Sequence, residues 1–238
     1  MSAAPLEVEN LSAGYGPMRI LENVSFSVPA GSRLAVLGRN GMGKTTLLAT
    51  LAGQTRRYDG AIRIGTTDIA GLQSAARAHR GLGYVPQTRD IFPTLTVEEN
   101  LFVGLKGRPR SALQEAYDMF PRLFERRRNL GSQLSGGEQQ MLSTARTILG
   151  KPSVLLLDEP LEGLAPVICE ELMAAFSELA KTGGMTIVLV EQRIQSALDF
   201  ADNVIILERG RVAWSGTSGE LGENHKTVEE LLGVGGLH

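Results

Sequence analysis

The chain of 238 residues is 42% hydrophobic and 21% charged, with a formal net charge of −2 at pH 7. Its length accommodates one large α/β domain, and its balanced charge excludes a general attraction to nucleic acid or anionic lipid. The single cysteine, Cys169, excludes an internal disulfide. No apolar run approaches the roughly 20 residues of a membrane-spanning helix, and residues 1–5 lack the basic and apolar regions of a signal peptide. We therefore expect a soluble, cytoplasmic protein.

Two strands are predicted near the N-terminus, over residues 6–11 and 21–28, because apolar side chains there alternate with polar ones. Residues 13–16, Ala-Gly-Tyr-Gly, predict a turn between them. Tyr15 is either an ordinary turn residue or a ring on which an adenine stacks. The phosphate-binding pattern that follows in the chain favours stacking.

Residues 38–46, Gly-Arg-Asn-Gly-Met-Gly-Lys-Thr-Thr, match G-x-x-x-x-G-K-[ST], the pattern of a phosphate-binding P-loop. An apolar strand (residues 33–37) precedes it and a helix (residues 46–52) follows it, which disfavours a chance glycine-rich turn. Glycines let successive backbone N–H groups point at a triphosphate. We expect Lys44 to reach the β- and γ-phosphates and Thr45 to bind Mg²⁺. The predicted nucleotide-binding residues of the P-loop are Gly38, Arg39, Asn40, Gly41, Met42, Gly43, Lys44, Thr45 and Thr46.

Two further strands are predicted over residues 61–65, after a turn at Asp59-Gly60, and over residues 82–86. A polar helical stretch lies between them. Gln87 stands just beyond the second strand, where open α/β sheets place ligand groups. Its amide is either a contact for Mg²⁺ or the attacking water, or a solvated loop amide, and position alone leaves both open.

Residues 93–150 show no strand pattern and predict an inserted helical subdomain. Thr96 to Glu99 and Ser111 to Gln114 each have the spacing of a capping box at a helix start. A later helix, closing at Gly150, is predicted to begin at residues 135–138, Ser-Gly-Gly-Glu, which form a second helix N-terminus suited to an anion.

Residues 154–157 form an uninterrupted apolar strand, as expected of a strand buried on both faces, and they are followed by Asp158 and Glu159. We expect Asp158 to hold Mg²⁺ opposite Thr45, and Glu159 to be the general base that polarises a water toward the γ-phosphate. Two exposed acids in a turn are the alternative, which a complete P-loop upstream disfavours.

The remaining elements alternate in type. The sequence predicts a helix from Pro166 to about Gly183, a buried strand over residues 186–190 that leads to Glu191 and Gln192, and a helix over residues 194–201. A strand over residues 203–207, a hairpin over residues 209–216 and a helical patch over residues 228–232 complete the chain.

The ordered set of Tyr15, the P-loop, Gln87, residues 134–138 (Leu-Ser-Gly-Gly-Glu, called the signature below) and residues 154–160 resembles the ATP-binding subunits of ABC transporters over nearly the whole chain. The resemblance implies an α/β P-loop NTPase (RecA-like) core with an N-terminal antiparallel β subdomain, over residues 1–92 and 151–238. Residues 93–150 would be the helical subdomain that carries the signature.

That resemblance also implies ATP hydrolysis with ATP and Mg²⁺ bound. Two subunits, identical or homologous, would meet head to tail, so that Ser135, Gly136, Gly137 and Glu138 hold the γ-phosphate of ATP on the partner's P-loop. Residues 162–166 would cross that interface. Residues 87–100, including Arg89 and Phe92, would couple to transmembrane permease subunits at the cytoplasmic face of the inner or plasma membrane. An extracytoplasmic substrate-binding protein would act indirectly.

One position departs from the family pattern, because Gln192 stands where a switch histidine is usual. A glutamine amide can hydrogen-bond the γ-phosphate but cannot titrate near neutral pH, which leaves Glu159 as the main candidate base. Val-Glu-Gln at residues 190–192 resembles the ATPases of branched-chain and hydrophobic amino-acid importers. Urea and short-chain amide importers share much of the pattern, and Glu162-Gly163 looks somewhat like theirs.

Other classes of P-loop ATPase and GTPase match the sequence less well than an importer ATPase does. A cytosolic ABC protein acting on ribosomes or nucleic acid usually carries two cassettes, long coiled coils or basic extensions, and the sequence shows none. Exporter ATPases typically keep the switch histidine. A P-loop GTPase would need a guanine-reading Asn-Lys-x-Asp, which is lacking, and in a GTPase or a small-molecule kinase the signature would have no purpose. The interpretation is therefore an importer ATPase whose partners do not include nucleic acid.

Overall fold

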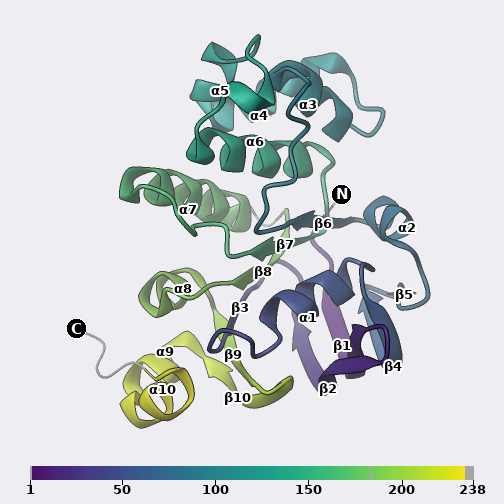
Figure 1. Ribbon diagram of the computed structural model, residues 1–238, viewed down its shortest axis with the longest axis vertical. Helices are drawn as coiled ribbons and strands as arrows, with labels where there is room; N and C mark the ends of the chain where they lie inside the picture. The colour runs from purple at the N-terminus through teal and green to yellow at the C-terminus, as the bar shows by residue number, and fades with distance from the viewer. Residues whose placement is uncertain (1, 183, 234–238) are drawn as a thin grey trace.

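The computed structural model describes residues 2–182 and 184–233, which contain two β-sheets with helices around them (Figure 1). An antiparallel sheet has the strand order β2-β1-β4-β5, and a larger sheet has the order β10-β9-β3-β8-β7-β6. All neighbouring strands of the larger sheet run parallel except the edge strand β10. The strands are β1 (Leu6–Tyr15), β2 (Met18–Val28), β3 (Arg33–Leu37), β4 (Arg56–Ile64), β5 (Thr67–Asp68), β6 (Leu82–Val85), β7 (Val154–Asp158), β8 (Thr186–Val190), β9 (Asn203–Glu208) and β10 (Arg211–Thr217).

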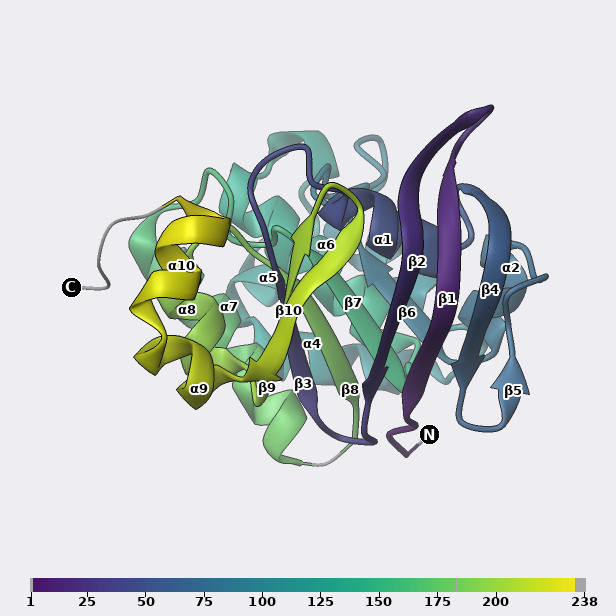
Figure 2. The same cartoon turned by 90° about the horizontal axis from the view of Figure 1, so that it is seen from below.

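Helices cover both faces of the larger sheet, which confirms the predicted α/β class. Figure 2 shows β2, β1 and β4 side by side at one side of the molecule and α9 and α10 at the other. The helices are α1 (Lys44–Leu51), α2 (Ser74–His79), α3 (Val97–Gly104), α4 (Leu113–Met119), α5 (Pro121–Glu125), α6 (Gly136–Leu149), α7 (Pro166–Lys181), α8 (Ile194–Phe200), α9 (Ser218–Glu223) and α10 (His225–Leu232).

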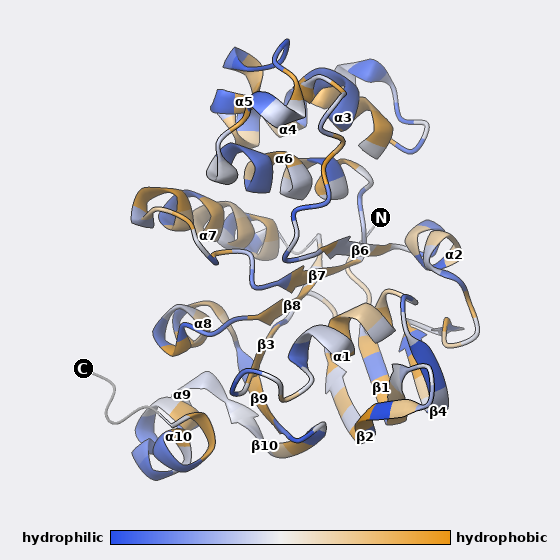
Figure 3. Cartoon of the chain, in the orientation of Figure 1, coloured by the Kyte–Doolittle hydropathy of each residue, from blue (hydrophilic) through white to orange (hydrophobic). Residues whose placement is uncertain are grey.

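Strand β7 shows how the sequence builds the layers. Successive side chains of a strand point to opposite faces. Leu156 packs in the cluster that contains Leu47 of α1, whereas Leu155 and Leu157 pack in the cluster that contains Phe176 of α7. All three leucines of β7 are fully buried, and Figure 3 shows this strand as hydrophobic. The unbroken apolar run therefore reflects burial on both faces, as predicted.

Residues 93–150 contain four α-helices and two short 3-10 turns, which lie together beyond α7 (Figure 1). The capping box at Thr96 is confirmed, because its hydroxyl accepts from the Glu99 N–H at 3.2 Å and the Glu99 carboxylate accepts from the Thr96 N–H at 2.8 Å. The division of the chain at residues 92 and 150 stays a prediction.

The second predicted capping box is wrong. Ser111 lies inside a 3-10 turn, Arg110–Ala112, and α4 starts only at Leu113, with no side-chain cap at its N-terminus. The N–H of Ala112 bonds to the carbonyl of Pro109 at 2.9 Å. Because this turn already fixes the backbone, the Ser111 hydroxyl is not at the helix start.

Two predicted turns are also corrected. β1 extends to Tyr15, so residues 13–15 belong to a strand and the turn follows them. β4 begins at Arg56 and runs through Asp59-Gly60. Gly60 has φ of +91°, and a Cβ there would lie 2.5 Å from the carbonyl oxygen of Glu9, so this glycine permits a close approach of two strands rather than a turn. The strand β5 and the helix α9 were not predicted. Gly183, where we expected a helix to end, lies outside the described residues.

The C-terminus of α1 is held by a buried arginine that the sequence analysis did not identify. Arg77 of α2 is only 3% exposed, and its Nη1 donates to the carbonyls of Thr50 and Leu51 at 2.8 Å each. Its Nε and Nη2 donate to the carbonyls of Leu72 and Ala70. A guanidinium at a helix C-terminus is favoured by the helix dipole, so Arg77 fixes the helix whose other end follows the P-loop.

We expect Arg77→Ala to lower the free energy of unfolding by about 3 kcal/mol, because buried carbonyls lose a charged donor. Chemical denaturation monitored by circular dichroism measures it. Arg80→Ala is the matched control, since Arg80 ends the same helix and is exposed. An equal effect of the two substitutions would contradict the assigned role.

Candidate functional site: a phosphate-binding loop facing two buried carboxylates

The P-loop connects β3 to α1 and owes its shape to glycine. Gly41 and Gly43 have φ of +79° and +101°, a region that favours glycine. Gly38 lies against β9, where a Cβ would come within 2.5 Å of the carbonyl oxygen of Leu207. Gly43 is the N-cap of α1, so the first turn of that helix opens into the loop and presents unpaired N–H groups and partial positive charge to an anion.

Lys44 is the buried cation of the loop, at 5% exposure. Its Nζ donates to the carbonyl of Gly38 at 2.8 Å and to that of Arg39 at 3.3 Å, and it lies 3.7 Å from Oε1 of Glu159. A buried ammonium is stable only with such partners. Lys44 and Glu159, 115 positions apart in the sequence, therefore meet as an ion pair at the carboxyl end of the sheet.

Asp158, at the end of β7, is completely buried. The hydroxyls of Thr45 and Tyr84 donate to its two oxygens, each at 3.2 Å. Burial raises the pKa of Asp158 to about 6, because desolvation penalises the charged form more than these hydrogen bonds favour it. Burial also raises the pKa of Tyr84. Thr45 and Asp158, both predicted to bind Mg²⁺, thus lie side by side, and Tyr84 is a partner that the sequence analysis missed.

Glu159 follows directly in a left-handed backbone conformation, with φ of +46°. Its own N–H bonds to the carbonyl of Val190 at 2.9 Å. Its Oε2 accepts from Nε2 of Gln192 at 2.7 Å and from Nε2 of Gln87 at 3.2 Å, and Gln87 also donates to Glu162. Two amides, one from the loop after β6 and one from the loop after β8, therefore hold this carboxylate beside Lys44. The link from Gln87 to Glu162 was not anticipated.

Lys44, Glu159 and the two amides line a cleft of about 390 Å³, whereas the buried Asp158 does not reach its surface. Tyr15 stands at it with half of its surface exposed, where an adenine ring could stack. Gly38, Arg39 and Met42, predicted as ligands, do not line this cleft but an adjoining cavity of about 530 Å³ beside α10. The cleft is lined by Tyr15, Ile20, Asn40, Gly41, Gly43, Lys44, Thr45, Thr46, Gln87, Glu159, Glu162 and Gln192.

The signature residues lie away from this cleft, at the start of α6. The Ser135 hydroxyl accepts from the Glu138 N–H at 3.3 Å, and the Glu138 carboxylate accepts from the Ser135 N–H at 2.8 Å, which forms a capping box. Glu138 also pairs with Arg126 at 3.3 Å. The Glu138 side chain therefore organises the helix start. Contact of Ser135, Gly136, Gly137 and Glu138 with nucleotide stays a prediction.

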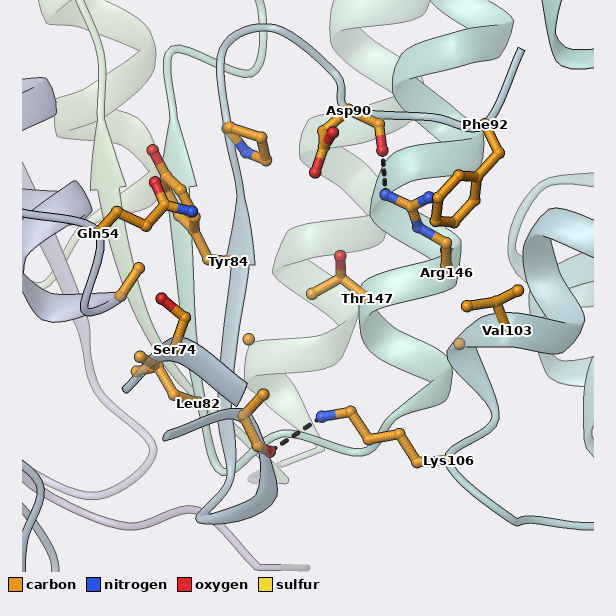
Figure 4. A pocket seen from close by; sticks show the side chains of 15 residues that line it. Gln54, Ser74, Leu82, Tyr84, Asp90, Phe92, Val103, Lys106, Arg146 and Thr147 are labelled. Carbon is orange, nitrogen blue, oxygen red and sulfur yellow. Dashed lines mark hydrogen bonds between the residues drawn. The ribbon is translucent and has the colours of Figure 1, made fainter. Parts of the chain in front are cut away.

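A lateral groove of about 300 Å³ lies on another face, between β6, α3 and α6 (Figure 4). Arg146 crosses it, donating to the carbonyl of Asp90, with its guanidinium 4.9 Å from the centre of the Phe92 ring. Lys106 closes the other end by donating to the carbonyl of Ala78 at 2.9 Å. Phe92 and Val103 remain 43% and 52% exposed, so two cations and an exposed apolar rim frame the groove.

Comparisons with known proteins agree with this geometry. Residues 21–162 match the family described as ABC transporter. The chain is 38% identical to the high-affinity branched-chain amino acid transport ATP-binding protein BraG of Pseudomonas aeruginosa, over 96% of this chain and 99% of that protein. It is 37% identical to the probable branched-chain amino acid transport ATP-binding protein LivF of Archaeoglobus fulgidus, with the same coverage.

Solved structures give the same result for the fold. A nucleotide-free ATP-binding cassette from an ABC transporter superposes with a TM-score of 0.83 at 23% identity, covering 98% of this chain and 100% of that one. A cassette solved as a dimer with ADP and phosphate, in a post-hydrolysis state, gives 0.80 at 25% identity, covering 90% and 98%. The predicted P-loop NTPase fold is confirmed. The chain belongs to the ABC transporter family and is an ATP-binding subunit that hydrolyses ATP.

Proposed function

We propose that this ATPase powers the uptake of branched-chain or related amino acids through separate permease subunits. The observation that carries the catalytic part is the Glu159 carboxylate, held by two amides beside Lys44 at the mouth of the P-loop. BraG and LivF, named for branched-chain amino acid transport, support the transport part.

In this proposal the triphosphate lies in the P-loop, with Lys44 exchanging its carbonyl and Glu159 contacts for the β- and γ-phosphates. The oxygen donors of Thr45 and Asp158 lie 3.2 Å apart and fit Mg²⁺, which prefers oxygen ligands and completes its shell with phosphate and water. Gln87 would contribute its amide oxygen. When bound, the ion would neutralise charge on the β- and γ-phosphates.

Glu159 is the proposed general base, which takes a proton from the water that attacks the γ-phosphate. Gln192, 2.7 Å from Glu159, would orient this carboxylate and donate a hydrogen bond to the γ-phosphate. Because an amide does not titrate near neutral pH, Gln192 contributes position rather than a proton.

We further propose that two ATPase subunits, identical or homologous, close head to tail. Ser135, Gly136 and Gly137 are then placed to bind the γ-phosphate on the partner's P-loop, because the start of α6 presents backbone N–H groups to an anion. In this chain those residues lie outside the Lys44 cleft, so the arrangement requires a second subunit. Dimeric ABC cassettes among the similar solved structures support it.

The lateral groove is the proposed contact with the permease. Exposed apolar side chains beside a cavity are typical of binding surfaces, and Phe92 lies five residues after Gln87, so a partner there would sense the nucleotide site. No helix among the described residues is long and apolar enough to cross a membrane. We place the chain at the cytoplasmic membrane face, with a substrate-binding protein acting on the other side.

Relatives named for lipopolysaccharide export and Fe(3+) ion import are also matched, at 32% and 33% identity. The direction of transport and the substrate therefore belong to the proposal and not to the family assignment. An ATPase of a urea or amide importer is the alternative that Glu162-Gly163 favours.

Glu159→Gln is expected to keep ATP affinity within about twofold while lowering kcat at least about 100-fold, because general-base catalysis contributes on that order. Nucleotide binding by fluorescence and phosphate release measure the two quantities. Glu170→Gln, on the exposed side of α7, is the control. Normal turnover by the Glu159→Gln protein would exclude Glu159 as the base.

Affinity purification of Glu159→Gln with ATP and Mg²⁺ from solubilised membranes is expected to recover polytopic permeases, whose associated binding protein then gives the substrate to assay. Adding Phe92→Asp should lower that recovery, because a charge enters the apolar rim of the lateral groove. Adding Phe124→Asp, at a similarly exposed phenylalanine of α5, should not. Recovery of ribosomal or nucleic-acid proteins without a permease would overturn the transport proposal.

A further inference from the structure

We propose that Glu191 is a positioning residue for ATP hydrolysis. Its carboxylate bonds both to the loop after Glu159 and to the backbone of Gln192, and so holds the Gln192 side-chain amide against the Glu159 carboxylate. This inference rests on the proposed roles of Glu159 and Gln192. It concerns a buried carboxylate outside the phosphate-binding cleft, which the mechanism proposed above does not use.

Glu191 follows β8 and is only 3% exposed. Its Oε1 accepts from the N–H of Leu161 at 3.2 Å, across a separation of 30 positions in the chain. Its Oε2 accepts from the N–H of Gln192 at 3.1 Å. The two oxygens of Glu191 therefore accept from different segments, Oε1 from the loop after β7 and Oε2 from the loop after β8.

These contacts close a ring around the base. The Glu159 N–H bonds to the carbonyl of Val190, directly before Glu191, and Gln192, directly after it, donates to the Glu159 side chain at 2.7 Å. The position of the Gln192 amide relative to Glu159 thus depends on how the two loops are joined. Besides Gln192 itself, Glu191 is a side chain that joins them.

Hydrogen bonds from both loops hold this arrangement. A small cavity of about 200 Å³ lies among Glu159, Leu161, Glu191 and Gln192, so neighbouring side chains have room to move if the anchor is lost. By accepting hydrogen bonds from both loops, Glu191 therefore helps to fix the distance between Glu159 and the Gln192 amide.

Burying the charged carboxylate of Glu191 between the two loops is energetically unfavourable. Burial raises the pKa of Glu191, and the nearby charge of Glu159 raises it further, while the backbone N–H groups act in the opposite direction. A carboxylate offers two acceptor oxygens, whereas an amide of the same shape offers one. Glu191→Gln therefore removes one of the two anchors with little change in volume.

The test compares Glu191→Gln in two backgrounds, the natural sequence and Gln192→Ala. In the natural background we expect kcat to fall about tenfold with ATP affinity within about twofold, because outer residues that orient a reacting group typically contribute 10- to 100-fold. In the Gln192→Ala background the same change should lower kcat less than twofold, because the group being positioned is gone. Glu208→Gln, at the exposed end of β9, should leave kcat unchanged.

Thermal unfolding of each variant separates positioning from stability. A merely structural Glu191 would lower Tm and leave kcat per folded molecule unchanged, which would overturn the proposal, as would an equal loss of kcat in both backgrounds. If Glu159→Gln itself turns over ATP normally, the proposed base fails. If Glu159→Gln is inactive and Glu191→Gln behaves like the unmodified protein, this inference alone fails.

Discussion

The burial of three charged side chains at one edge of the sheet is the constraint on which the site depends. Lys44, Asp158 and Glu159 are at most 7% exposed, and buried charges are tolerated only where partners compensate them. Lys44 has two P-loop carbonyls and Glu159. Asp158 has the hydroxyls of Thr45 and Tyr84. The contacts that compensate these buried charges thus also hold Lys44, Thr45, Asp158 and Glu159 in the positions from which they would bind a magnesium triphosphate.

The fold supplies this arrangement through parallel strands. β3, β8 and β7 are consecutive parallel strands of the larger sheet, with β8 in the middle. Their carboxyl ends therefore bring the P-loop, the two carboxylates and Gln192 to one edge. α1 packs against β7 and against the antiparallel sheet, and Arg77 fixes its far end. The start of α6 lies elsewhere, which is why hydrolysis in this account needs the signature of a second subunit.

Sequence patterns predicted the parts of the fold where one local rule dominates. The strand over residues 154–157 and the cap at Thr96 follow from burial on both faces and from spacing, and both are present. The cap at Ser111 is absent, because a 3-10 turn competes for the same backbone. In the site, the motifs predicted that Thr45 and Asp158 would lie close together, and they do. The contacts of Tyr84, Glu162 and Glu191 join segments 30 or more positions apart, and no local pattern encodes such pairs.

The most direct test of the account is a structure of the protein with Mg²⁺ and a non-hydrolysable ATP analogue. We expect Lys44 Nζ to leave Glu159 for the β- and γ-phosphate oxygens, and Glu159, still bonded to Gln192, to face a water in line with the γ-phosphate. A bound triphosphate with Lys44 still paired to Glu159, or with the γ-phosphate held outside the P-loop, would contradict the account.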